Sequence, residues 1–317
     1  SAPLSSGQSN TALGYQALTA FTTGYSNTAI GKGAGDAINT GYNNTIIGYS
    51  AGTNITTGFN NVIIGRVAAY ASTDVDKAVI IGEQAAYTGN MTSAADGTIS
   101  IGNNAGKNVT SAEASTFVGS GAGANVTTGD HNTAFGKSAG SNITTGGETV
   151  TVGYLAGQYA TGSYNTFVGS EAGKGGTTSA PFSSGVYNTA IGYQALKAFT
   201  TGGSNTAVGF YSGKSITTAT SNTLMGIFSG DALTTGGENT AIGHSALSAE
   251  DTGTRNVAVG NQVFIKLNYD GTGYNTGLGY GAGYHNVLGV SNTYLGGQAG
   301  LNATGSYNTF VGHLAGY

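Results

Sequence analysis

The chain has 317 residues, a formal net charge of −4 and no cysteine, and only 8% of its residues are charged while 57 are glycine. Average soluble domains carry roughly 25% charged residues and about 7% glycine. The ten Lys and Arg residues are scattered singly, which argues against binding to DNA or RNA, and the absence of cysteine excludes disulfides and thiolate metal sites.

A short repeat runs through almost the whole chain. Its unit reads Asn-Thr-Ala-Ile-Gly-x-x-Ala-Gly and is followed by a turn that ends in Thr-Thr-Gly. We call the first glycine of the unit the anchor glycine and count repeat positions from it, so that position −1 is the residue before it. The anchor glycines are Gly14, Gly31, Gly48, Gly65, Gly82, Gly102, Gly119, Gly136, Gly153, Gly169, Gly192, Gly209, Gly226, Gly243, Gly260, Gly279, Gly296 and Gly312. A spacing of mostly 17 residues predicts one coil of a narrow β-solenoid per repeat. The expected fold is therefore all-β, a parallel β-solenoid of about eighteen coils without helices.

The strand before each anchor glycine shows which residues share a face. Position −1 is apolar in every copy, and position −3 is Thr in thirteen copies and Val or Ile in the other five. Side chains alternate along a strand, so these two positions lie on one face. The exchange of Thr for Val or Ile predicts that this face points inward. The nearly constant alanine at position +3, as in Ala17 and Ala34, is expected to face the same thin core from a second strand.

Position −2 lies on the opposite face and is mostly apolar, so it is predicted to point outward and to pack against another chain. The candidates for this lateral interface are Ile46, Ile63, Ile80, Phe117, Phe167, Tyr294 and Phe310. The adjacent anchor glycine has two interpretations. It allows close approach of another backbone, or it permits a positive φ at a corner of the coil.

Position −4 is Asn in fourteen of the eighteen copies. Stacked Asn side chains can form ladders of amide hydrogen bonds between coils, and we favour this structural role over ligand binding. The glycine of the Thr-Thr-Gly turn is expected to supply a positive φ. The residues predicted to form the structural ladder are Asn10, Asn27, Asn44, Asn61, Thr11, Thr28, Thr45, Gly14, Gly31 and Gly48.

A longer repeat lies above the short one, because residues 1–7 recur as residues 179–185 with one substitution. This predicts a first superunit of ten coils at residues 1–178 and a second, continuous superunit of eight coils at residues 179–317. No capping segment is evident, so coils are expected to stack head to tail between chains, the alternative being a fragment of a longer fibre. The end residues that would meet are Ser1, Pro3 and Leu4 at one end and Leu314 and Tyr317 at the other.

Three insertions interrupt the period. They add three residues between Gly82 and Gly102, six between Gly169 and Gly192, and two between Gly260 and Gly279. Loops that leave a solenoid are where binding usually concentrates. The candidate loop residues for binding are Tyr87, Asn90, Phe264, Lys266, Tyr269 and Asp270.

No residue pattern predicts catalysis, a cofactor or a metal. The four His residues fall in different coils, and the Gly-x-Gly pieces have no βαβ unit around them. Two acidic pairs, Asp74 with Asp76 and Glu250 with Asp251, leave a calcium site open, although solvated turns are the favoured interpretation.

The phrase Asn-Thr-Ala-Ile-Gly-Tyr-Gln-Ala-Leu with its Thr-Thr-Gly turn resembles repeats of bacteriophage tail-fibre proteins and the head repeats of trimeric autotransporter adhesins. The adhesin repeats are shorter than 17 residues. The resemblance covers nearly the whole chain and implies a homotrimer of solenoids packed side by side.

We therefore expect a non-catalytic, rigid shaft of an extracellular fibre, on a virion tail or a cell surface, that presents loops or a tip for attachment. The expected partners are copies of the chain itself, as a homotrimer or a head-to-tail polymer, and a cell-surface glycan or protein receptor. Neither nucleic acid nor membrane insertion is expected. The first alternative is a self-assembling filament. An ice-binding β-solenoid is a lesser alternative, because the regular Thr position is predicted to face inward.

Overall fold

The computed structural model describes residues 6–178 and 182–317. The chain divides into two compact units, Ser1–Leu155 (unit 1) and Ala156–Tyr317 (unit 2), and each is considered by itself. Both units are parallel β-solenoids with one short strand in every coil. The predicted fold class is confirmed. The end candidates Ser1, Pro3 and Leu4 and the first residues of the second superunit lie outside the described residues.

The strands are three residues long and occupy positions −3 to −1 of each repeat. Unit 1 contains β1 (Thr11–Leu13), β2 (Thr28–Ile30), β3 (Thr45–Ile47), β4 (Val62–Ile64), β5 (Val79–Ile81), β6 (Ile99–Ile101), β7 (Thr116–Val118), β8 (Thr133–Phe135) and β9 (Val150–Val152), and a short 3-10 helix η1 (Ser93–Ala95) in its insertion. Unit 2 contains β10 (Thr166–Val168), β11 (Thr189–Ile191), β12 (Thr206–Val208), β13 (Thr223–Met225), β14 (Thr240–Ile242), β15 (Val257–Val259), β16 (Thr276–Leu278), β17 (Thr293–Leu295) and β18 (Thr309–Val311).

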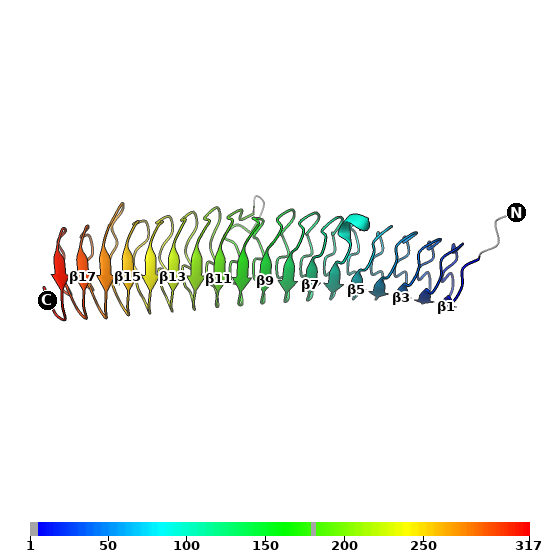
Figure 1. The fold of residues 1–317 in the computed structure, drawn as a ribbon, viewed down its shortest axis with the longest axis horizontal. Coiled ribbons are helices and arrows are strands. Elements are labelled where there is room, and N and C mark those ends of the chain that lie inside the picture. The colour runs from blue at the N-terminus through cyan, green and yellow to red at the C-terminus, as the bar shows by residue number, and fades with distance from the viewer. Residues whose placement is uncertain (1–5, 179–181) are drawn as a thin grey trace. The chain divides into compact units, whose positions relative to one another are not determined.

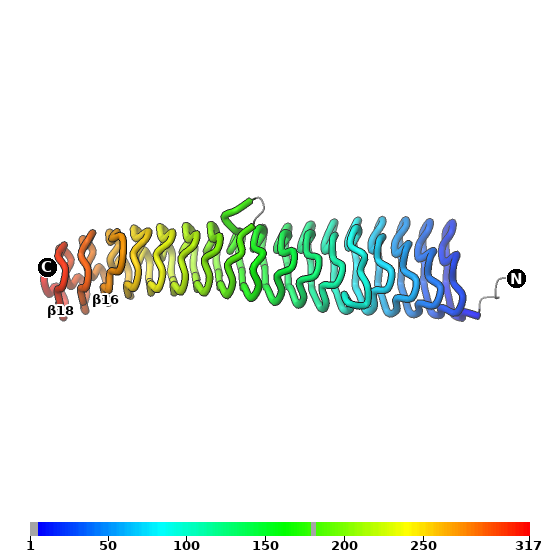
Figure 2. Tube along the Cα trace, turned by 90° about the horizontal axis from the view of Figure 1, so that it is seen from above, coloured from blue at the N-terminus to red at the C-terminus, as the bar shows by residue number. Residues whose placement is uncertain are grey.

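Equal repeat positions stack on one another within each unit. In the pairing of β2 with β3, for example, Thr28 lies beside Thr45 and Ala29 beside Ile46. The strand arrows of neighbouring coils accordingly run side by side in the same direction (Figure 1). Within each unit the turns of the chain follow one another in sequence order, as the trace seen from above shows (Figure 2). Each strand side chain thus lies beside the residue of the same repeat position one coil away.

Hydrogen bonds between coils continue outside the strands. Leu18 N donates to Ala34 O at 3.1 Å, and Gly31 N donates to Leu13 O at 2.8 Å. The predicted second strand is nevertheless absent from the described coils, because positions +2 and +4 adopt positive φ. Gln16 has φ 57° and Leu18 has φ 52°, which an extended strand does not contain. The alanine at position +3 still reaches the core: Ala34 is fully buried.

The anchor glycines form the corner of each coil. Their φ lies between 124° and 140°, a region that residues with a Cβ rarely adopt. A Cβ added to Gly31 would lie 2.5 Å from the carbonyl oxygen of Gly48, so the close approach is to the next coil of the same chain. The Thr-Thr-Gly glycine has a different role from the predicted one. Gly24 does not have a positive φ, but a Cβ there would lie 2.5 Å from Gly41 O.

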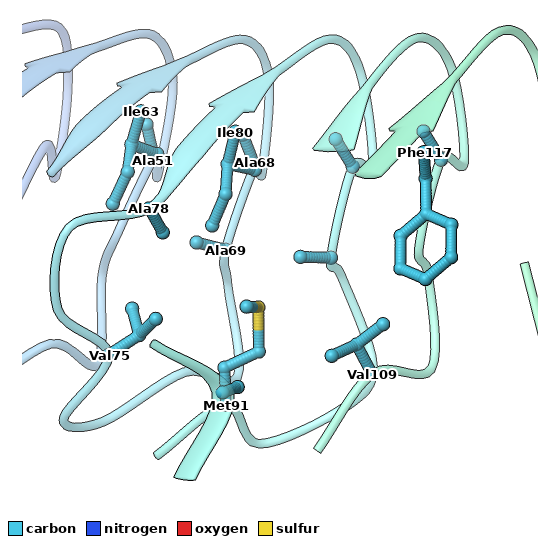
Figure 3. Close-up of a cluster of buried hydrophobic side chains, with 14 of the residues drawn as sticks. Ala51, Ile63, Ala68, Ala69, Val75, Ala78, Ile80, Met91, Val109 and Phe117 are labelled. Atoms are coloured by element: carbon cyan, nitrogen blue, oxygen red, sulfur yellow. The ribbon is translucent and has the colours of Figure 1, made fainter. Parts of the chain in front are cut away.

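The core is filled from position −2, which corrects the predicted direction of the strand. In Figure 3, Ile63 and Ile80 project from the strands toward the alanines, Val75 and Met91 of the coil interior. The predicted lateral-interface residues that are fully buried are Ile46, Ile63, Ile80, Phe117, Phe167 and Tyr294. Phe310 is half-buried and stacks on Tyr294, with ring centroids 5.4 Å apart. These residues therefore stabilise the coil and cannot form a lateral interface.

Large and small side chains alternate between positions −2 and +4. Where position −2 is aromatic, position +4 is glycine, and a Cβ on Gly123 would lie 2.2 Å from Cδ1 of Phe117. Where position −2 is alanine, as at Ala190, a leucine such as Leu196 can fill the space, and both are fully buried. An aromatic ring at position −2 thus leaves no room for a side chain at position +4, as close packing requires.

The asparagines of position −4 form the ladder expected from the sequence. Asn44 donates from its backbone N and from Nδ2 to Asn27 Oδ1, at 3.1 and 3.0 Å. Its Nδ2 also donates to Gly58 O at 2.8 Å, and its own Oδ1 accepts from Asn61. These side chains are buried, so each amide satisfies backbone groups that water cannot reach.

Candidate functional site

The outward side chains of the strands form the surface that we call the outer strand face, made of positions −3 and −1. All eighteen copies of the repeat hold only Thr, Val, Ile, Leu, Met or Phe at these two positions, and none holds a charge. A sheet face turned to water usually carries polar side chains in alternation with the core residues. An uncharged outer face that extends over every strand of a unit is therefore a candidate binding surface.

Several apolar side chains of this face are exposed in the single chain. The exposed fraction is 56% for Phe135, 45% for Met225 and 51% for Leu278. Single exposed apolar residues are common on soluble proteins, whereas a continuous row of them marks a site of interaction. The row here is continuous within each unit, because equal repeat positions stack.

Position +1, just past the corner glycine, adds an aromatic rim to part of this face in unit 2. Tyr193, Phe210 and Ile227 occupy this position in successive coils and are 40%, 41% and 47% exposed. The rings of Tyr193 and Phe210 stack with centroids 5.4 Å apart. Charged residues lie on both sides of the strand. At position −5 Arg255 Nε pairs with Glu238 at 2.8 Å, and at position +1 in unit 1 Arg66 pairs with Glu83.

The loop residues predicted for binding do not form one site. Tyr87 is half-buried and packs against Tyr70, with ring centroids 5.6 Å apart. Asn90 is exposed and accepts a hydrogen bond from Thr73 at 2.9 Å. Phe264 is a wrong prediction, because it is fully buried at position +4 and packs on Tyr294. The extra residues enter the chain after this position, so Phe264 keeps its place in the core.

The remaining candidates of this insertion lie at the surface. Lys266 and Asp270 are exposed, and Tyr269 is half-buried. The backbone N of Tyr269 donates to Glu250 Oε2 at 3.4 Å. Of the end candidates, Leu314 is 42% and Tyr317 68% exposed.

Glu250 is a buried acid in a core position, which corrects its interpretation as a solvated turn residue. It is fully buried at position +7, where most coils carry Ile, Leu, Val or Phe, and its Oε1 accepts from Gly253 N at 2.7 Å. Burial raises the pKa of Glu250 from 4.5 to about 7, while the hydrogen bonds from Gly253 and Tyr269 oppose the shift. Counting repeat positions from the anchor glycine Gly243 would have placed this residue in the core from sequence alone.

The other acidic pair is also structural. Asp76 is buried, and its Oδ1 accepts from Phe59 N at 2.9 Å. Burial raises the pKa of Asp76, against the effect of the Phe59 hydrogen bond. Asp74 accepts a hydrogen bond from Thr57. Within the described ranges, no three metal-ligating side chains lie together.

Comparisons with protein-family models, with curated proteins and with solved structures find no match to this chain. In the described part of the chain, no helix is long and apolar enough to cross a membrane.

Proposed function

We propose that the protein is a non-catalytic, rigid shaft of an extracellular fibre, of the phage tail-fibre or adhesin kind, whose copies associate side by side through the outer strand face. The observation that supports this most strongly is the complete absence of charge from positions −3 and −1 in all eighteen repeats. A monomeric solenoid would gain solubility from charges there, as sheet proteins commonly do. A second copy of the chain offers the same uncharged surface, and contact between the two copies would bury both outer strand faces.

The area of the face indicates what the interface must include. Nine strands about 4.8 Å apart and roughly 10 Å long present roughly 430 Å² in one unit. A stable interface buries about 800 Å² on each partner. The strands of one unit are therefore too small alone, and the contact needs further surface, such as the strands of the other unit or the aromatic rim at position +1 with Tyr193 and Phe210.

The test is the mass of the protein in solution. Wild-type protein is expected at three times the chain mass, and the double variant Met225→Lys, Leu278→Lys at the chain mass with unchanged circular dichroism. Both side chains are half exposed in the single chain, so lysine fits there without unfolding a coil. A matched control is Ser204→Lys with Ser221→Lys at position −5, which holds Lys77 elsewhere, and it should keep the trimer. A monomeric wild type, or dissociation by the control alone, would overturn side-by-side association.

Head-to-tail assembly remains the alternative, through end residues such as Leu314 and Tyr317, which are exposed. It predicts a mass that grows with concentration without a fixed stoichiometry. The Met225→Lys, Leu278→Lys variant would not change such growth, because it leaves the end coils intact.

A second candidate function, ice binding, is favoured by one corrected observation. The Thr side chains of position −3 face outward and stand in thirteen of the eighteen repeats, about 4.8 Å apart where neighbouring coils both carry Thr. The Thr side chains were predicted to point inward, which argued against ice binding, and that prediction is therefore wrong. Thermal hysteresis from a monomeric wild type would support this function, and its absence at millimolar protein would exclude it.

A further inference from the structure

One coil of unit 2 departs from the repeat and leaves a hollow at the surface. Position +2 carries Gln262 in the coil of β15 and Gln298 in the coil of β17, but Gly281 in the coil between them. A Cβ on Gly281 would meet only Gln298 Cγ and Leu301 Cδ1, both at 3.7 Å, so the space above it is open. The resulting hollow of about 290 Å³ is called the β16 notch. It is lined by Gln262, Tyr280, Gly281, Tyr284, His285, Gln298 and Leu301.

The walls of the notch combine aromatic rings with amides. Tyr280 is 58% exposed and offers a ring at the rim. The side chains of Gln262 and Gln298 are half-buried, and neither amide has a hydrogen-bond partner among the described residues. A glutamine amide donates and accepts at once. These walls match a sugar ring, because each sugar hydroxyl donates and accepts hydrogen bonds and the C–H face of the ring packs on an aromatic side chain.

The notch also has a positive edge. Nζ of Lys266 lies 3.1 Å from Nδ1 of His285 and 5.4 Å from the centre of the Tyr284 ring. No carboxylate of the described residues forms an ion pair with Lys266, although the chain as a whole is acidic. A lysine held in this way is available to an anion, with which it forms a charge-assisted hydrogen bond.

The combination occurs in one coil only. Gly33 and Gly121 leave the same gap at position +2, but positions +1 and +5 of their coils are Lys32 with Asp36 and Ser120 with Ala124. In the coil of β16 both positions are tyrosine, and Lys266 stands at position +6 of the preceding coil, beside His285 at the same position of the β16 coil. The features needed for recognition thus meet where the repeat is broken.

We propose that the β16 notch binds an acidic saccharide, a sugar ring that carries a carboxylate. The ring packs on Tyr280, the amides of Gln262 and Gln298 bind its hydroxyls, and Lys266 binds the carboxylate. This site lies past the corner glycine. Apart from Tyr280 at position +1, its side chains belong to positions +2, +5 and +6, which the lateral association does not use.

The test is calorimetric titration of the full chain with a glucuronic acid oligosaccharide and with the matching glucose oligosaccharide. Gly281→Gln refills the gap with the side chain of both neighbours, whose φ of 59° and 56° is close to the 63° of Gly281, so the coil should fold. We expect this variant to weaken binding of the acidic sugar at least tenfold. Lys266→Gln should weaken the acidic sugar about tenfold and leave the neutral one unchanged. Gly33→Gln, the same change in unit 1, should leave binding as in the wild type.

Three results would overturn the proposal: no binding of the acidic sugar to the wild type, equal binding to Gly281→Gln, or equal affinity for the two sugars. The mass in solution is recorded for every variant. A trimer that binds no sugar refutes the notch alone, whereas a monomer that binds sugar refutes lateral association alone.

Discussion

The direction of the strand side chains can be tested with two neighbouring isoleucines of β4. Ile63 is fully buried in the core, whereas Ile64 is half-buried on the outer strand face. The two residues have the same side chain and the same replacement, lysine, so only the face differs. The sequence-based interpretation predicted the opposite order of damage.

The magnitudes differ because only one ammonium group can reach water. Burial in an apolar core lowers the pKa of a lysine by about 3–5 units, which costs roughly 4–7 kcal/mol at about 1.4 kcal/mol per unit. Such a loss is comparable with the whole stability of many domains. At Ile64 the lysine stem can lie along the sheet with its ammonium in water, and the expected change is within about 1 kcal/mol.

The assay is urea unfolding followed by circular dichroism, on protein dilute enough to be monomeric by mass. Ile63→Lys should lower the midpoint strongly or leave the chain unfolded at pH 7, and Ile64→Lys should not. The folded-state pKa of the buried lysine is lowered, so the unfolded state binds more protons and the stability of Ile63→Lys should rise toward pH 10. If Ile64→Lys is the more damaging change, or if Ile63→Lys shows no gain at high pH, the assignment of the core face is wrong.

Three further changes probe the interior of the coil. Asn44→Ala leaves Asn61 N and Gly58 O without their partners and should cost about 2–4 kcal/mol in urea unfolding, whereas Asn44→Ser should cost less, since Ser115 in the same position accepts from Asn132 N at 3.1 Å. Phe117→Ala should cost about 3–5 kcal/mol of unfolding free energy. Adding Gly123→Leu should restore most of the loss, because it reproduces the Ala190 and Leu196 pair, whereas Gly123→Leu alone should be damaging. If the urea midpoints of both single variants and of the double variant equal that of the wild type, the side chains of positions −2 and +4 do not compensate for each other in volume. The pKa of buried Glu250 is about 7 against an ordinary 4.5, so the folded state holds the proton more tightly than the unfolded state. Roughly 3 kcal/mol of stability should therefore be lost as pH rises from 4.5 through 7. Glu250→Gln should remove this dependence of the unfolding free energy on pH, and an equal dependence in both proteins would contradict the buried acid.

The sequence predicts the solenoid well because its period and its alternation are local signals. The spacing of the anchor glycines gives the coils, and the recurrence of Asn at position −4 gives the ladder that Asn27 and Asn44 form. Alternation also shows correctly that positions −3 and −1 share a face. It does not show which face is inside, because alternation is symmetric with respect to the two sides of a strand.

The inversion has a physical cause in the small size of the core residues. Position −2 is often alanine, as at Ala29 and Ala134. Alanine has a smaller apolar side chain than the Ile and Val of position −1, so the sequence favours position −1 as the buried position. A narrow coil, however, has room for little more than a methyl group where a second bulky residue such as Leu18 or Ile38 enters from the turn. The β-branched residues of the outer strand face satisfy strand propensity instead, and they pack against equal residues of neighbouring coils.

The β16 notch was not predicted for a related reason. Added residues can be recognised from the spacing of the anchor glycines, and Lys266 lies close to such an insertion. The hollow itself arises from a missing side chain, that of Gly281, in a chain where glycine is the commonest residue. Only the register of coils shows that this glycine stands between two glutamines. In a solenoid, then, a binding site is better sought as a departure from the column of equal positions than as a motif along the chain.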